Sequence, residues 1–226
     1  MTSATTIKRL AKLKQKKYRE AKRLFLAEGQ TLVEEATTAP AHLFSDFDAL
    51  KRLSTLTTPT GPVAVFPFLD ISPEELLDAR SRIVLLNGVQ DPGNVGTVVR
   101  AAHAFGAGIA LARGTADLYN SKTVRATMGS IFHAPVSREL DILEFLALAR
   151  SSGFATVAAV PEGGERPGSL GAEKLVVVVG AEGSGLPEEV VSACSWRVTI
   201  PALAASLNAA VAASILLYEA YVRVLP

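Results

Sequence analysis

The sequence predicts an α/β protein whose larger part is built on a parallel sheet. From residue 82 onward, short valine-rich apolar segments alternate with segments of helical character. These apolar segments are continuous rather than alternating, which is typical of parallel strands covered on both faces. The chain has 226 residues, of which 49% are hydrophobic and 20% charged. It is therefore long enough for one sizeable core and a small additional module.

A basic helix and a small α/β module are expected before this sheet, in residues 1–75. Residues 6–29 predict a helix with a thin apolar stripe. The module is expected to continue with a strand, a turn and a helix in 24–36, a strand in 41–45, a helix in 46–53 and a strand in 61–68. Ser72 has the pattern of a helix start and leads into the second domain, residues 76–226.

The second domain is expected to alternate strands and helices along its length. Its strands are predicted at 82–89, 108–112, 154–160, 175–180 and 196–201, and its helices at 94–106, 120–129, 142–153, 186–194 and 206–223. Because parallel strands need crossover connections, the helices are expected to cover both faces of the sheet.

The charge of the chain is divided unevenly. Residues 1–23 hold nine Lys or Arg and one acidic residue, whereas the remainder has a net charge of −7. Such a division indicates a polyanionic partner reached through one end of the chain, and the alternative is a solvated surface helix. The candidate contacts are Lys8, Arg9, Lys12, Lys16 and Lys17 in this segment, with Lys122 and Arg125 from the helix at 120–129.

Composition argues against several other classes of protein. Cys194 is the only cysteine, so no internal disulfide can form and a reducing cytoplasm is expected. His42, His103 and His133 are scattered without partners at metal-ligand spacing, so no metal site is expected. The longest apolar helical segment, 209–218, is too short to cross a membrane, and the basic segment lacks the apolar run of a signal peptide.

A glycine-rich turn is predicted where the strand at 175–180 ends. Gly180, Gly183 and Gly185 surround Glu182 between this strand and the next helix. Open α/β folds bind ligands at this carboxyl edge, and glycines let backbone groups approach a flat ligand such as adenine. The segment lacks the lysine of a phosphate-binding loop and the glycine spacing of the dinucleotide fingerprint. The alternative is a tight strand-to-helix turn, which does not require Glu182.

Two further strand-to-helix junctions carry polar side chains in apolar surroundings. Asn94 and Arg100 follow the strand at 82–89, and Ser206 and Asn208 lie at the start of the final helix. Taken singly, Asn94 and Ser206 have the pattern of helix caps, and Arg100 that of a surface charge. Asn208 falls in a nearly all-apolar helix and therefore needs a hydrogen-bond partner.

Taken together, the three junctions form an ordered set of motifs. They are NVGTVVR (94–100), VVVVGAEGSGL (176–186) and IPALAASLNAAVAASI (200–215). This set resembles the three motifs of the SpoU-type RNA ribose 2′-O-methyltransferases, a branch of the SPOUT superfamily. Residues 120–136 and 25–36 resemble two accessory segments of the same enzymes, so the resemblance covers most of the chain.

The resemblance implies a parallel sheet with a C-terminal trefoil knot, which the sequence pattern alone does not predict. It also implies a homodimer formed through the final helix and the knot, with S-adenosylmethionine bound in the knot. By position, the implied cofactor contacts are Ala159, Gly180, Glu182, Gly183, Gly185, Ile200, Pro201 and Leu207. The implied catalytic residues are Asn94, Arg100, Glu182, Ser206 and Asn208.

The reaction that the resemblance implies is methylation of a ribose 2′-hydroxyl in RNA. This hydroxyl is a weak nucleophile and must lose its proton as it attacks. Arg100 stays protonated, so we expect it to stabilise the alkoxide or to orient a phosphate rather than to act as the base. Asn94, Ser206 and Asn208 are expected to fix the ribose, with Glu182 holding Arg100 or Asn94 in place.

Two departures from the family pattern keep other functions open. The loop at 202–205 has four residues where relatives carry a longer one, and the N-terminal module is shorter than usual. One alternative is therefore an RNA-binding protein with a degenerate methyltransferase domain, such as an assembly factor without turnover. Another is a nucleotide-binding α/β enzyme of a different kind. For the methyltransferase, the N-terminal module favours ribosomal RNA over tRNA as the substrate.

Overall fold

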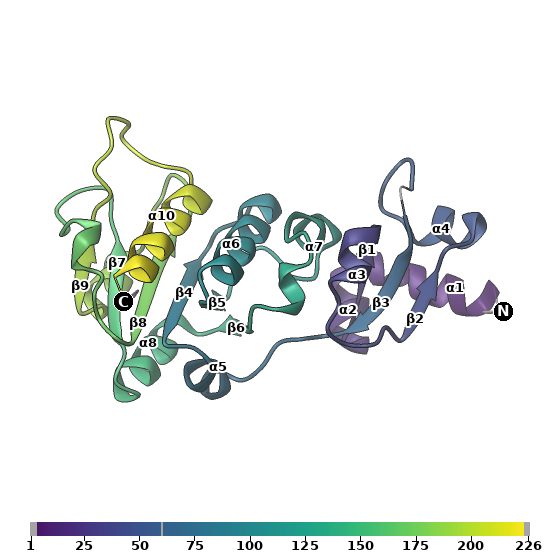
Figure 1. The fold of residues 1–226 in the computed structure, drawn as a ribbon, viewed down its shortest axis with the longest axis horizontal. Coiled ribbons are helices and arrows are strands. Elements are labelled where there is room, and N and C mark those ends of the chain that lie inside the picture. Colours follow the sequence, from purple (N-terminus) through teal and green to yellow (C-terminus); the bar gives the residue numbers. More distant parts are fainter. Residues whose placement is uncertain (1–3, 60, 224–226) are drawn as a thin grey trace.

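Two separate β-sheets organise the chain, as the computed structural model shows (Figure 1). The structure describes residues 4–59 and 61–223. The short ends of the two expected domains, 1–3 and 224–226, and residue 60 lie outside these ranges. The three-stranded sheet lies at one end of an elongated molecule and the six-stranded sheet occupies the middle and the other end.

The three-stranded sheet is antiparallel, with the strand order β1-β3-β2. Its elements are α1 (Ala4–Leu10), η1 (Ala11–Lys14), α2 (Lys16–Lys22), β1 (Leu24–Glu28), α3 (Gln30–Glu34), β2 (His42–Phe44), α4 (Phe47–Leu53) and β3 (Val63–Pro67). Leu10 and Leu13 are buried against β1 and α4, so the basic segment contributes to the core of this part.

The expectation of one continuous helix over residues 6–29 is wrong. Gln15 has an extended backbone with φ −104° and ψ 133°, which separates η1 from α2. Arg23 adopts the left-handed conformation with φ 49°, which ends α2 directly before β1. Helical periodicity could not reveal either break, because both positions are occupied by residues that also occur within helices.

The six-stranded sheet confirms the predicted parallel α/β architecture, with the strand order β6-β5-β4-β8-β7-β9 and every pair parallel. Its strands are β4 (Arg82–Asn87), β5 (Gly108–Ala112), β6 (Val136–Leu140), β7 (Ala155–Ala159), β8 (Leu175–Gly180) and β9 (Trp196–Val198). Its helices are α5 (Pro73–Ala79), α6 (Pro92–Ala104), α7 (Ser121–Ala126), η2 (Ser130–Phe132), α8 (Ile142–Ser151), η3 (Pro167–Ser169), α9 (Glu188–Ala193) and α10 (Ala209–Val222).

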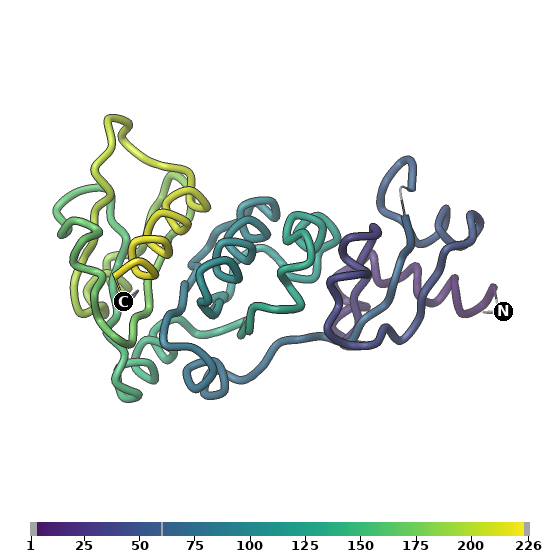
Figure 2. The backbone as a smooth tube through the Cα atoms, viewed as in Figure 1, coloured from purple at the N-terminus to yellow at the C-terminus, as the bar shows by residue number. Residues whose placement is uncertain are grey.

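Helices cover both faces of this sheet, which explains its continuous apolar strands. On one face α6 and α10 pack side by side against Val84 and Val177, as the tube in Figure 2 also shows. On the other face α5, α8 and α9 pack against Ile83 and Val176. Successive residues of a strand point to opposite faces, so both faces need apolar residues. Within the described residues, no helix is long and apolar enough to cross a membrane.

Buried polar contacts fix the N-terminal part against the larger sheet. Arg19 of α2 donates to the backbone oxygen of Leu13 at 2.7 Å and forms an ion pair with Asp117 of the β5–α7 loop, with both side chains at least nine-tenths buried. The Tyr119 hydroxyl donates to Asp70 at 2.8 Å, and burial raises the pKa of Tyr119, so this hydroxyl remains a donor. The first contact joins α2 to the β5–α7 loop, and the second joins the segment between the two sheets to the same loop.

Candidate functional site

The predicted glycine-rich turn lies at the carboxyl edge of β8. Gly180 pairs with Asn87 of β4, and the backbone N–H of Gly185 donates to the oxygen of Ala181 at 3.0 Å. A Cβ on Gly180 would overlap the carbonyl group of Gly185 and lie 2.7 Å from the backbone nitrogen of Leu186. The turn can therefore close only because position 180 has no side chain.

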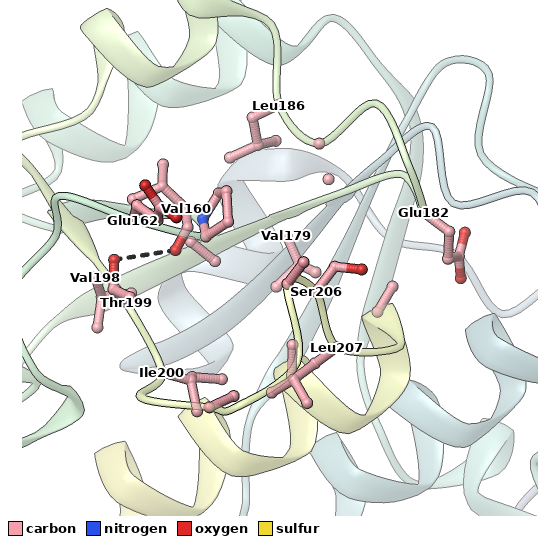
Figure 3. A pocket seen from close by; sticks show the side chains of 18 of the residues that line it. Val160, Glu162, Val179, Glu182, Leu186, Val198, Thr199, Ile200, Ser206 and Leu207 are labelled. Atoms are coloured by element: carbon pink, nitrogen blue, oxygen red, sulfur yellow. Dashed lines mark hydrogen bonds between the residues drawn. The ribbon is translucent and has the colours of Figure 1, made fainter.

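A cleft of about 830 Å³ opens beside this turn (Figure 3). It lies between the ends of β7, β8 and β9 and the segment that leads into α10. The structure brings all eight predicted cofactor residues together on its walls, and Ser206 with them. They are Ala159, Gly180, Glu182, Gly183, Gly185, Ile200, Pro201 and Leu207.

The chemistry of the cleft fits S-adenosylmethionine. Val179, Ile200 and Leu207 give it apolar walls suited to an adenine ring. Glu162 and Glu182 add two carboxylates, which Figure 3 shows on separate sides of the cleft, and carboxylates attract a sulfonium cation. The size and the mixed lining match a nucleoside with a charged tail better than a purely apolar ligand.

One threonine holds the cleft rim, and the short loop at 202–205 forms part of the cleft wall. The Thr199 hydroxyl donates to the oxygen of Val160 at 3.1 Å and accepts from the backbone of Gly164 at 2.9 Å. These bonds tie the chain after β7 to the end of β9. Ala202, Ala204 and Ala205 line the cleft, so the loop reaches the cleft despite its length.

Three of the predicted catalytic residues form one hydrogen-bonded chain. The Asn94 amide nitrogen donates to the Glu182 carboxylate, and the Asn208 amide nitrogen donates to the Asn94 oxygen at 3.1 Å. Asn94 comes from α6, Glu182 from the turn after β8 and Asn208 from the start of α10. The structure thus joins one residue from each of the three sequence motifs.

Neither Asn94 nor Ser206 caps its helix, which was the alternative role of each position taken singly. Asp91, not Asn94, caps α6, because its carboxylate accepts from the backbone of Asn94 at 3.0 Å. Asn208, not Ser206, caps α10, and its oxygen accepts from the backbone of Ala210 at 2.9 Å. The final helix therefore begins at Ala209 rather than at Ser206. A carboxamide and a hydroxyl both serve as caps, so composition alone did not distinguish them.

The other two predicted catalytic residues lie outside this chain of hydrogen bonds. Arg100 is exposed on α6, and its guanidinium has no hydrogen bond or ion pair with any residue that the structure describes. Glu182 therefore holds Asn94 and not Arg100. Ser206 lines the cleft with its hydroxyl free of protein partners in the described part of the chain.

Gly96 lies inside α6, within the helix predicted at 94–106. A Cβ at this position would overlap the side chain of Ala126 and lie 2.8 Å from the oxygen of Thr123, both in α7. Gly96 therefore permits close packing of α6 against α7, a long-range contact that no local pattern encodes.

A second cavity, of about 400 Å³, lies on the other side of the glycine-rich turn. It shares Ala181, Glu182, Ser184 and Gly185 with the first cleft, and its other walls are Asn87, Gly88, Gln90 and Pro187. Sequence reasoning did not find it, because Asn87 and Gln90 belong to none of the motif positions assigned a role. Glu182 is thus the ionisable residue common to both cavities.

The predicted RNA contacts divide into free and paired cations. Lys16 pairs with Glu139 at 2.8 Å, Lys122 with Asp91 at 3.5 Å, and Arg125 with Glu28 at 3.6 Å. Lys12 and Lys17 lie over the ring of Tyr18 at 5.3 and 5.0 Å. Lys8 and Arg9 are exposed, and their side chains have no ion pair among the described residues.

Fold and site together define an α/β enzyme with a cofactor cleft at the carboxyl edge of its sheet. Residues 81–218 match the model of the SpoU rRNA Methylase family, and residues 4–45 match the MRM3-like substrate binding domain. The chain therefore belongs to the SpoU rRNA methylase family, and the resemblance seen in its three motifs is confirmed.

Similar proteins match almost the whole chain. A 23S rRNA (guanosine(2553)-2′-O)-methyltransferase of Bacillus subtilis is 33% identical over 94% of this chain and 94% of its own. An rRNA methyltransferase of Sinorhizobium meliloti, solved with AdoMet bound, is 30% identical, covers 100% of this chain and 98% of its own, and has a TM-score of 0.90. A putative RNA methyltransferase of the TrmH family from Porphyromonas gingivalis has 32% identity, 99% coverage of both chains and a TM-score of 0.87.

Proposed function

We propose that the chain transfers a methyl group from S-adenosylmethionine to a ribose 2′-hydroxyl of ribosomal RNA. The observation that carries the proposal is the chain of hydrogen bonds from Asn208 through Asn94 to Glu182, which ends at the wall between two cavities. A transfer reaction needs two neighbouring sites with polar groups fixed between them. A binding protein with a degenerate site has no need to keep this arrangement.

The residues of the chain have distinct tasks in this reaction. S-adenosylmethionine, when bound, supplies an electrophilic methyl group. The turn at 180–185 and the segment at 200–207 would hold it, with apolar walls around the adenine. Asn94, Ser206 and Asn208 orient the ribose, and Glu182 fixes the amide of Asn94. The amides thus position the ribose and do not transfer a proton.

Arg100 supplies a fixed positive charge in this proposal, and it does so in the site of a second subunit. It is exposed and does not contact Glu182 in its own chain. The helix α10, which packs beside α6 on the same face of the sheet, carries two exposed apolar side chains, Val211 and Tyr218, and the Phe105 ring lies 5.7 Å from the Tyr218 ring. This apolar surface supports a homodimer formed through α10. The C-terminal trefoil knot that the family resemblance implies would lie beside that interface.

The RNA substrate is inferred from the relatives and from the N-terminal part. Residues 4–45 match a substrate-binding domain, and the Bacillus subtilis relative acts on 23S rRNA. We assign residues 1–75 to an RNA-binding module and residues 76–226 to the methyltransferase domain. Ribosomal RNA is favoured over tRNA on these grounds.

Two measurements test the proposed function. Calorimetry should show S-adenosylmethionine binding with a dissociation constant below millimolar. Mapping of 2′-O-methylation in RNA from cells that lack the protein should reveal one unmodified ribosomal position, which the purified protein restores in vitro. Absence of cofactor binding at millimolar concentration would contradict the proposal and favour a binding protein without turnover.

Replacement of Arg100 with lysine is expected to lower kcat by at least about 10-fold. A lysine keeps the charge but loses the planar fork of donors, which suits a phosphate or an alkoxide. Cofactor affinity by calorimetry should stay unchanged, and Arg113→Lys, an exposed arginine that pairs with Asp141, serves as the control. Full turnover in the Arg100→Lys variant would show that the fork is not needed.

Loss of charge at Lys8 and Arg9 is expected to weaken RNA binding and its salt dependence. Because residues 1–23 include buried Leu10 and Arg19, deletion of the segment would disturb the fold, so point variants are required. The double variant Lys8→Gln/Arg9→Gln should reduce the slope of log K against log salt by about 1.5. The control is Arg113→Gln/Arg150→Gln, two exposed arginines that line neither cavity, and an unchanged slope in the Lys8→Gln/Arg9→Gln variant would indicate a solvated surface.

A further inference from the structure

The second cavity has a chemistry of its own. Asn87 ends β4 and Gln90 lies three residues later, and the side-chain amides of both have no hydrogen bond to any described residue. Both residues line a cavity of about 400 Å³, and Glu182 and Ser184 line it with them. This volume lies in the range of small-ligand sites.

The lining excludes an anion and favours an uncharged polar ring. Among the residues that the structure describes, no Lys, Arg or His lines this cavity, and the Glu182 carboxylate would repel a phosphate. An amide presents one acceptor and two donor hydrogens, so Asn87 and Gln90 can match a ligand edge that alternates donors and acceptors. Nucleobases have such edges, and asparagine and glutamine are common partners of them.

The position of the cavity agrees with the geometry of a nucleotide. In a ribonucleotide the base and the 2′-hydroxyl are attached to neighbouring ribose carbons, so the base of the reacting nucleotide must lie beside the reaction centre. The cavity meets this condition, because Glu182 lines it and accepts a hydrogen bond from Asn94. A base turned out of its stack could enter such a cavity while its ribose lies at Asn94.

We infer that this cavity is a nucleobase site, in which the amides of Asn87 and Gln90 select the base of the nucleotide to be methylated. The inference rests on the proposed function for the identity of the reacting nucleotide. The hydrogen-bonding role of the two amides is separate from methyl transfer and can be measured without it.

The binding experiment uses four short homopolymers, one for each RNA base, and fluorescence anisotropy. The wild-type protein should prefer one of them. Asn87→Ala and Gln90→Ala should each reduce that preference by roughly 5- to 100-fold, as expected for loss of an amide–base pair. Ser151→Ala is the control, because the Ser151 hydroxyl is exposed, bonds the oxygen of Leu148 on its own helix and lines neither cavity. Unchanged cofactor affinity and thermal unfolding would show that the variants are folded.

The second experiment measures kcat/KM on a minimal RNA with each base at the methylated position. The two alanine variants should accept all four bases more evenly than the wild type. Methyl transfer with an unchanged base preference in both assays would overturn the nucleobase site and leave the proposed function standing. Loss of base preference in the binding assay, without methyl transfer by the wild type, would overturn the proposed function and support the site.

Discussion

Replacement of Gly180 with alanine is expected to weaken S-adenosylmethionine binding by at least about 100-fold. The new methyl group would overlap the backbone of Gly185, and backbone cannot rotate away as a flexible side chain can. The turn at 181–185 must then open, and this turn forms part of both cavities. Calorimetry with the cofactor measures the effect directly.

Gly171→Ala is the matched control for this experiment. A Cβ at Gly171 would meet no atom within 4 Å, so cofactor affinity should stay at the wild-type value. Thermal unfolding of both variants separates a local effect on the turn from general unfolding. Wild-type affinity in the Gly180→Ala variant would show that the turn does not shape the cofactor site.

Replacement of Arg19 with alanine is expected to lower the free energy of unfolding by roughly 3–5 kcal/mol. Arg19 and Asp117 are both buried, and removal of the guanidinium leaves the Asp117 carboxylate without its cation in a site shielded from water. The bond from Arg19 to the oxygen of Leu13 is lost as well. Urea denaturation followed by circular dichroism gives the difference.

Two further variants show whether the loss of stability in Arg19→Ala comes from the unpaired buried charge. Lys16→Ala removes an ion pair with Glu139 in which both side chains are about half exposed, and should cost less than about 1 kcal/mol. The double variant Arg19→Met/Asp117→Leu replaces the buried pair with apolar side chains and should regain most of the lost stability. If Arg19→Ala costs no more than Lys16→Ala, the buried pair does not hold the two parts together.

The arrangement of strands and helices was largely predictable because it depends on local patterns. The run of valines before Gly180 predicts a strand covered on both faces, and β8 lies at the centre of the sheet with helices on both sides. The capping box of Ser72 and Glu75 likewise begins α5 where the sequence predicts a helix start. The periodicity of apolar residues and the cap residues depend only on positions a few residues apart, so the sequence reveals them directly.

The remaining features depend on residues far apart in the chain. Arg19 and Asp117 are 98 positions apart, and nothing near either residue indicates the other. The three motifs pointed to Asn94, Glu182 and Asn208, but the order of their hydrogen bonds and the separate position of Arg100 required coordinates. The second cavity was missed because its two amides come from the last residue of β4 and from the loop that follows it, and neither position stands out in the sequence.

The oxygen and the nitrogen of the Asn208 amide have different partners, and this fixes the direction of the hydrogen bonds from Asn208 to Glu182. Its oxygen accepts from the backbone of α10, so its nitrogen is left to donate to Asn94. The Asn94 oxygen is then occupied, and its nitrogen must point to Glu182. If either amide flipped alone, a donor would face a donor or an acceptor would face an acceptor. The first turn of the last helix therefore sets the orientation of the Asn208 and Asn94 amides up to Glu182. A shift of that helix would change which amide atoms at the reaction centre are free to form hydrogen bonds.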